Sequence, residues 1–149
     1  MDFEFISGDK LADIMKRDAA GKDYLVIDVR DDDYHGGNIV NAINHPSIGF
    51  SDRVDELVKS TKDIPVLVFH CFLSQLRGPK AARLYMKRRR VHFGAEAGLS
   101  QRVYVLEGGF EVFQAKFKDD PTLVENWKKS VWEIDVNDFV QTPAAAGEL

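Results

Sequence analysis

Cysteine is almost absent from this chain, because its 149 residues include only Cys71. A single thiol excludes a disulfide within the chain and indicates a reducing compartment. Long apolar runs are also missing: the longest have four residues, whereas a membrane helix needs about 20. The opening sequence MDFEFISGDK has no basic stretch followed by an apolar one, so no secretory signal is expected.

No sign of charge dominates the chain. It has 20 Lys and Arg against 24 Asp and Glu, and the net charge of −4 gives no general attraction to nucleic acids or anionic membranes. One stretch departs from this balance, since residues 77–95 hold seven basic side chains and no acid. Aromatic side chains that could stack on bases are sparse there, which favours a solvated helix face or a docking site for an acidic or phosphorylated protein. We therefore expect no nucleic-acid partner, no membrane partner, and a cytoplasmic or nuclear location, or both.

The residues that are present suffice for one folded domain, because 44% of the chain is hydrophobic and 11% is aromatic. Apolar runs at 24–29 and 65–70 are typical of buried strands. Residues 42–45 are expected to form a shorter strand, and residues 103–110 a buried strand followed by a double-glycine turn. Apolar residues at helical spacing follow Ser7, which can cap a helix, and the spacing recurs at 51–59 and at 79–90. A further short helix is expected after the double-glycine turn, through residue 116. Strands that alternate with helices predict an α/β domain with a mainly parallel central sheet flanked by helices.

The end of the chain has a different character. Residues 121–149 include Trp127 and Trp132, which are expected to anchor a C-terminal arm, and finish in TPAAAGEL, a sequence typical of a frayed tail. The predicted division is a catalytic domain at 1–120 and an arm with its tail at 121–149.

The single cysteine stands where the strongest predicted strand ends. Cys71 follows the run 65–70, five residues separate it from Arg77, and Gly78 and Pro79 then begin a helix. Ligands of open α/β sheets bind outside the carboxyl ends of the strands. Backbone N–H groups of the intervening loop should converge on a bound anion above the helix N-terminus. The loop residues are Phe72, Leu73, Ser74, Gln75 and Leu76.

Arg77 adds a permanent positive charge to this loop. Its guanidinium is a planar fork that can hold two oxygens of a tetrahedral oxyanion. Cations and helix N-termini also lower the pKa of a thiol from about 8.5 to about 3.5–7.5. We therefore predict that Cys71 is ionised at neutral pH and attacks an oxyanion held by Arg77 and the loop amides.

Two neighbours of the cysteine are assigned supporting roles. His70 precedes it in the strand and points to the opposite face, so a positioning role is expected, and Ser74 is expected to donate a hydrogen bond to the sulfur. A lone cysteine is more often a buried filler, but the strand, the spacing, the arginine and the helix start together favour a reactive thiol. No metal site is predicted, because one Cys beside one His lacks ligand spacing and the other histidines are scattered. These are His35, His45 and His92.

The sequence HCFLSQLRGPKAA at 70–82 resembles the active loop of small rhodanese-fold phosphatases of the mitotic-inducer type. Within that group it is most similar to the stand-alone members of fungi and plants and to the eukaryotic arsenate reductases. VIDVR at 26–30 resembles the first-strand signature of this fold, and VLEGGF at 105–110 its late strand-turn-helix signature. The resemblance covers residues 5–117 and implies a rhodanese-like α/β fold.

The resemblance also implies a two-step reaction. Cys71 attacks phosphorus to form a phosphocysteine, which water hydrolyses, while Arg77 and the loop amides stabilise the transition state. The implied substrate is a phosphoprotein or a small oxyanion, and no cofactor is implied. With arsenate, the same attack gives a thiol–arsenate adduct. Because the chain has no second cysteine, an external reductant, glutathione or a glutaredoxin-like partner, would have to reduce that adduct.

One part of the family pattern is missing. The larger mitotic-inducer enzymes carry a Glu in the loop, whereas residues 72–76 include no acid. A general acid that protonates the leaving group raises the reaction rate by about 10²–10⁴-fold. No residue is assigned this role here, and four acids are candidates only because the expected fold places them near the site. The candidates are Asp31, Asp32, Asp33 and Glu107. The nearby Asp28 and Arg30 are expected to form a structural pair that ties loops together.

Two alternatives keep the fold and change the function. A sulfurtransferase of this fold has a loop one residue shorter, which holds a persulfide, so the present spacing favours a tetrahedral anion. Non-enzymatic rhodanese-like binding modules commonly lack the cysteine or the arginine, and both are present here. The prediction is a cysteine-dependent protein phosphatase of tyrosine or dual specificity, with arsenate reduction as a further activity or as the main role.

Overall fold

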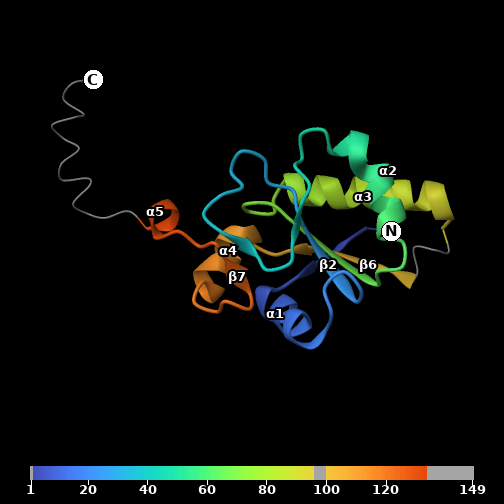
Figure 1. Cartoon of the computed structure of the whole chain (residues 1–149). Helices are drawn as coiled ribbons and strands as arrows, with labels where there is room; N and C mark the ends of the chain where they lie inside the picture. The colour runs from blue at the N-terminus through green and yellow to red at the C-terminus, as the bar shows by residue number, and fades with distance from the viewer. Residues whose placement is uncertain (1, 96–99, 134–149) are drawn as a thin grey trace, which may run out of the picture.

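The computed structural model describes residues 2–95 and 100–133. Its centre is a parallel sheet formed by β1 (Glu4–Ile6), β2 (Tyr24–Asp28), β4 (Ile43–Asn44), β5 (Val66–His70) and β6 (Arg102–Leu106). The strand order is β1-β6-β5-β2-β4, and Figure 1 shows β2 and β6 of this sheet near the centre of the molecule. A separate antiparallel pair joins β3 (Asn38–Ile39) to β7 (Val124–Glu125).

Helices cover both faces of the sheet. On one face, α2 (Phe50–Ser60) and α3 (Arg77–Phe93) pack on Leu25, Ile27, Leu67 and Phe69 of the central strands. On the other, α1 (Gly8–Arg17) and α4 (Gly109–Phe117) pack on the alternate strand residues. Those residues are Tyr24, Val26, Val68 and Leu106. Because both faces are covered, β2 and β5 are apolar rather than alternating up to their last residues, Asp28 and His70.

The two central strands place the candidate site. β2 and β5 are paired in register from Tyr24↔Val66 to Asp28↔His70, so their carboxyl ends lie side by side. The chain leaves β5 at His70, passes through a loop and enters α3 at Arg77. This is the strand-end position at which open α/β sheets bind ligands.

The α/β fold with a parallel sheet, predicted from the alternation of elements, is confirmed. Three details differ from the prediction. The helix after Cys71 begins at Arg77 rather than at residue 79, and β1 was not expected. Asn38 lies in β3, where no apolar run predicts a strand, because residues of β7 far along the chain supply its strand partner.

Part of the expected C-terminal arm packs on the domain. Leu123 and Val124 are buried, and the Trp127 indole N–H donates to Oε1 of Gln114 at 2.8 Å. The short helix α5 (Lys129–Trp132) follows. The predicted frayed tail at 142–149 lies outside the described residues, and the boundary near residue 120 stays a prediction. Among the helices that the structure describes, none is both long and apolar enough to cross a membrane.

Candidate active site

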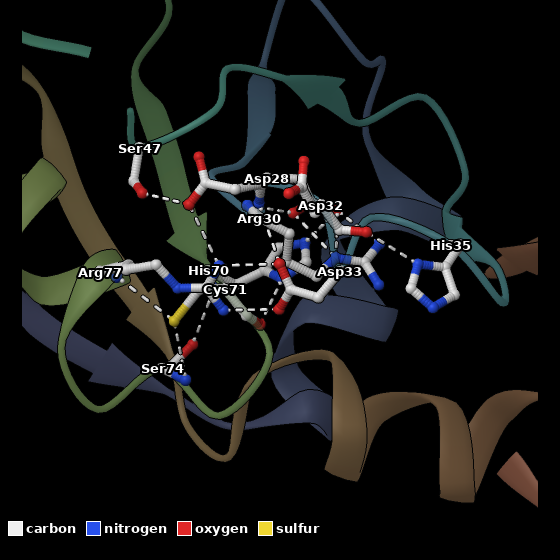
Figure 2. Close-up of polar contacts among 12 residues, drawn as sticks. Asp28, Arg30, Asp32, Asp33, His35, Ser47, His70, Cys71, Ser74 and Arg77 are labelled. Carbon is white, nitrogen blue, oxygen red and sulfur yellow. Dashed lines mark hydrogen bonds and ion pairs between the residues drawn. The ribbon is translucent and has the colours of Figure 1, made fainter. Parts of the chain in front are cut away.

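The sulfur of Cys71 is held by backbone N–H groups. The residue is only 3% exposed, and its Sγ accepts hydrogen bonds from the N–H of Ser74 at 3.2 Å and of Gly78 at 3.4 Å (Figure 2). Both donors belong to the loop and the first turn of α3. Two main-chain donors from different parts of the loop region therefore converge on the sulfur.

Ser74 acts differently from the sequence prediction. Its backbone has a φ of 56°, in the left-handed region, and its own N–H is the group that donates to the sulfur. The Ser74 hydroxyl was expected to be this donor, but its oxygen instead accepts a hydrogen bond from the N–H of Cys71 at 3.4 Å. The side chain therefore closes the turn, and the main chain contacts the nucleophile.

The loop is supported from behind by the start of α4. The N–H of Phe110 donates to the carbonyl oxygen of Cys71, and the N–H of Glu111 to that of Phe72, both at 3.0 Å. Gly109 lies against the same two carbonyls: an added Cβ would be 2.4 Å from the Phe72 oxygen and 2.7 Å from the Cys71 oxygen. These bonds direct the first two loop carbonyls toward α4.

A pocket of about 350 Å³ opens over the sulfur. Two of its side chains are well exposed, Leu76 at 81% and Leu73 at 38%. The pocket therefore combines an ionic floor with an apolar rim. Its lining residues are Asp33, Cys71, Phe72, Leu73, Gln75, Leu76 and Arg77.

Arg77 is bound by two carboxylates. Nη1 donates to Oδ1 of Asp33 at 2.8 Å and to Oδ2 of Asp31 at 3.2 Å, and Nη2 donates to Oδ2 of Asp33 at 2.6 Å. The hydrogen bonds and charge of Arg77 lower the pKa of Asp33 to about 2, and those of Asp33 raise the pKa of Arg77. Burial alone would raise the pKa of Asp31, but hydrogen bonds from Ile48, Ser47 and Arg77 outweigh it and lower the pKa. All three groups are therefore charged at neutral pH.

Asp28 and Arg30 form a fully buried ion pair below the loop. Nη2 of Arg30 lies 2.7 Å from Oδ2 of Asp28 and also donates to the carbonyl oxygen of Gly37 at 3.0 Å. The Arg30 guanidinium carbon is 4.4 Å from the ring centroid of Phe110 and 4.8 Å from that of Tyr34. The pair thus joins the end of β2 to residues 34–37 and to α4.

His70 lies on the buried side of the same cluster. Its Nδ1 is 3.0 Å from the carbonyl oxygen of Cys71, and its Nε2 is 3.6 Å from Oδ2 of Asp28. Burial lowers the pKa of His70, so the ring is neutral at physiological pH. The ring also stacks on Phe110, with centroids 6.1 Å apart. These contacts fit the positioning role predicted from its place in the strand.

Trp132 contacts the loop from the far end of the chain. Its ring stacks on Phe72 with centroids 5.6 Å apart and an interplanar angle of 7°, and its indole N–H donates to the carbonyl oxygen of Gly36 at 2.7 Å. It therefore joins the cysteine loop to the loop that carries Asp31 and Asp33. The sequence predicts Trp132 as an anchor for the arm but gives no signal that it reaches the site.

None of the four candidate acids presents a proton to the pocket. Asp31 and Asp33 are ionised through their bonds to Arg77, and an ionised carboxylate has no proton to donate. Asp32 and Glu107 are exposed and do not line the pocket. Among residues 2–95 and 100–133, no three His, Cys, Asp or Glu side chains are grouped in a way that could hold a metal ion.

Known proteins are similar to this chain in sequence and in structure. Residues 9–116 match the Rhodanese-like domain family. The dual specificity phosphatase ibp1 of Schizosaccharomyces pombe is 35% identical over 112 residues, which make up 67% of this chain and 81% of that protein. The structure of Ygr203w, a yeast protein tyrosine phosphatase of the Rhodanese family, aligns with a TM-score of 0.74 at 23% identity, over 89% of this chain and 99% of the other. The As-Sb reductase of Leishmania major aligns with a TM-score of 0.71 at 30% identity, over 83% of this chain and 85% of the other.

Proposed function

Because this chain belongs to the Rhodanese-like domain family, we propose that its site is that of a cysteine-dependent phosphatase acting on phosphoproteins. Membership confirms the resemblance inferred from HCFLSQLRGPKAA, and relatives that are phosphatases or arsenic reductases support an enzyme. The observation that carries the proposal is the convergence of two N–H groups on the Cys71 sulfur, beside Arg77, in an open pocket. Such a site stabilises first a thiolate and then a developing oxyanion.

The reaction proceeds in two displacements. The Cys71 thiolate attacks phosphorus, the P–S bond forms, and the P–O bond to the substrate oxygen breaks, so that this oxygen leaves and takes up a proton. Arg77 and the loop N–H groups bind the non-bridging oxygens during the transfer. Water then attacks the phosphocysteine, the P–S bond breaks, and inorganic phosphate and the thiolate are released.

The rim of the pocket favours an organic phosphate over a bare oxyanion. Leu73 and Leu76 are exposed beside the sulfur, and the Phe72 ring also lines the pocket. Exposed apolar side chains around a site commonly mark contact with another molecule. An aryl or protein substrate would cover these side chains, whereas phosphate or arsenate alone would leave them in water.

Arsenate reduction is the second candidate, supported by the similarity to the Leishmania As-Sb reductase. Arsenate joined to Cys71 would form an S–As bond with loss of water. Glutathione would then attack the sulfur, so that the electron pair of the S–As bond passes to arsenic and arsenite leaves. A second thiol, from glutathione or a glutaredoxin, would reduce the resulting mixed disulfide. Both thiols must be external because the chain has one cysteine.

Parallel assays of the purified protein test these proposals. One assay follows release of phosphate from an aryl phosphate, and the other follows reduction of arsenate with glutathione and glutaredoxin, each beside the Cys71→Ser variant. Cysteine-dependent phosphate release supports the phosphatase, and arsenate reduction alone would replace it with the second candidate. Activity in neither assay, with transfer of sulfur from thiosulfate to Cys71, would identify a sulfurtransferase instead.

Arg77→Lys is expected to lower kcat/KM for an aryl phosphate by about 10²-fold or more. A single ammonium cannot hold two oxygens in the plane that the guanidinium offers. Steady-state kinetics of the variant provide the measurement, and Lys80→Arg, which alters an exposed cation on the same helix, serves as the control. Full activity of Arg77→Lys would remove Arg77 from the mechanism.

Trp132→Ala is expected to lower kcat/KM by about tenfold, because the Phe72 ring loses the surface on which it stacks. The matched control is Trp127→Ala, which removes another indole from the same segment but one bonded to Gln114 rather than to the loop. Thermal unfolding should show a similar loss of stability in both variants, on the order of 1–3 kcal/mol. Equal activity of the two variants would show that the Trp132 contact serves stability alone.

A further inference from the structure

The hydrogen bonds of Arg77 leave one edge of its guanidinium unused. An arginine has five N–H donors, and those on Nη1 and Nη2 that face Asp31 and Asp33 are used in three bonds. Within the described part of the chain, Nε–H and the second N–H of Nη2 have no hydrogen-bond partner. These two donors form one side of the fork, the side that can bind two oxygens of an oxyanion in bidentate fashion.

The two carboxylates that hold Arg77 are themselves fixed. Oδ1 of Asp33 accepts the N–H of Asp31 at 3.0 Å. Asp31 in turn accepts the hydroxyl of Ser47 and the N–H of Ile48, the latter bond being 2.9 Å long. Both acids are thus preorganised acceptors rather than freely rotating side chains, and they restrict where the guanidinium can lie.

Figure 2 shows the result of this arrangement. The Arg77 guanidinium lies between the Asp33 carboxylate and the Cys71 sulfur, with the carboxylate on one side and the sulfur on the other. Asp33, Cys71 and Arg77 all line the same pocket. A substrate oxyanion above the sulfur would therefore meet the edge of Arg77 that the carboxylates leave unused.

We propose that Asp33, fixed through Asp31, is a positioning residue that orients Arg77 so that its Nε–Nη2 edge binds the transferred phosphoryl or arsenyl group. The inference rests on the proposed function, because it assigns to Arg77 the oxyanion of that reaction. The sequence indicates Asp33 only as one candidate acid, and no local pattern predicts its contact with Arg77. Asp33 does not donate a proton in this role.

The charge of Asp33 has the opposite effect on anion binding to its proposed orientation of Arg77, which makes the inference testable. Its negative charge lies near the position of an anionic substrate and would repel it. If charge alone mattered, removal of the carboxylate would strengthen anion binding. If orientation of Arg77 matters more, removal would weaken it, because a misplaced fork loses its two-point contact.

The test uses Asp33→Asn, titrated with inorganic phosphate in a calorimeter and assayed with an aryl phosphate. Asparagine retains an Oδ1 acceptor for the Asp31 N–H but presents an N–H₂ group toward Nη2, so the paired contact with Arg77 is lost. We expect the phosphate dissociation constant and KM to rise by about tenfold or more, with a smaller change in kcat. Asp32→Asn is the matched control, since it removes the same charge from an exposed neighbour outside the pocket and should change neither constant.

A double-mutant cycle separates orientation from a general effect on the fold. In an Arg77→Ala background, Asp33→Asn should no longer weaken phosphate binding, because the group that it orients is absent. The inference would be overturned if Asp33→Asn weakened phosphate binding equally in the wild-type and the Arg77→Ala backgrounds. It would also be overturned if either single variant, Asp33→Asn or Arg77→Ala, bound phosphate more tightly than wild type. Circular dichroism of each variant verifies that the fold is retained, and Asp33→Glu, which keeps the charge but moves it, should restore part of the binding.

Failure of this inference can be told apart from failure of the proposed function. A wild-type protein that binds phosphate but hydrolyses no ester would contradict the proposed phosphatase activity. The phosphate titrations of the variants would still test whether Asp33 orients Arg77. A protein that hydrolyses the ester equally well with and without the Asp33 carboxylate would contradict the inference alone. A wild-type protein that neither binds phosphate nor hydrolyses the ester would overturn both.

Discussion

Replacement of Cys71 by serine is expected to abolish turnover of an aryl phosphate and of arsenate while the protein stays folded. Loss of a nucleophile commonly lowers kcat by several powers of ten, and we expect at least about 10³-fold here. The N–H groups of Ser74 and Gly78 donate hydrogen bonds to the sulfur that the proposed mechanism uses as its nucleophile. A serine hydroxyl is a far weaker acid than a thiol, and the ionised carboxylate in the same pocket, Asp33, is bonded to Arg77 rather than to residue 71.

The expected stability of this variant follows from the same contacts. Serine is close to cysteine in size, and its oxygen can accept the two N–H groups that now reach the sulfur, so the free energy of unfolding should fall by no more than about 1–2 kcal/mol. Kinetics and urea unfolding of the purified variant are the measurements. Residual turnover above about 10% of wild type would show that another residue is the nucleophile.

Gly109→Ala is expected to combine a large loss of activity with a clear loss of stability. The new Cβ would lie 2.4 Å from the Phe72 carbonyl oxygen and 2.7 Å from that of Cys71, at a φ of 61° that favours glycine. Neither carbonyl can retreat without moving the loop, because both accept hydrogen bonds from α4. We expect kcat/KM to fall by about 10²-fold or more and the free energy of unfolding by about 2–5 kcal/mol.

Gly21→Ala separates the clash from the backbone strain. Gly21 has a φ of 80°, but an added Cβ there meets no atom within 4 Å. This variant should lose about 1 kcal/mol of stability through strain alone and keep full activity. If Gly109→Ala behaves in the same way in unfolding and kinetic measurements, the contact between α4 and the cysteine loop does not control the site.

The fold could be predicted from the sequence where its signals are local. The apolar runs at 24–29 and 65–70 indicate the two central strands, since a strand covered on both faces needs mainly apolar side chains. β1 could not be predicted from the sequence, because it has only three residues and two of them are exposed. It forms by pairing with β6, about a hundred positions later in the chain. β3 and β7 escaped for the same reason, with two residues each.

The candidate site divides along similar lines. Cys71, the loop and Arg77 occupy one short segment whose spacing predicts an anion site, and the structure brings them together around one pocket. The partners of that segment lie far away along the chain: Asp33 precedes Arg77 by 44 residues. No local pattern specifies such a contact. The double glycine at 108–109 signals a turn, but only the fold shows that Gly109 lies against the cysteine loop.

The hydrogen bonds from α4 to the cysteine loop and the stacking of Trp132 on Phe72 have a consequence for protein synthesis. A ribosome-bound chain that ends near residue 100 already contains the nucleophile, Arg77 and both acids that bind it. It lacks β6, the strand that separates β5 from β1, and it lacks the helix whose N–H groups direct the loop carbonyls away from the sulfur. The thiol is therefore translated well before its complete environment exists. Roughly thirty further residues must be translated before Trp132 can stack on Phe72, which is the last of the described contacts of the site to form.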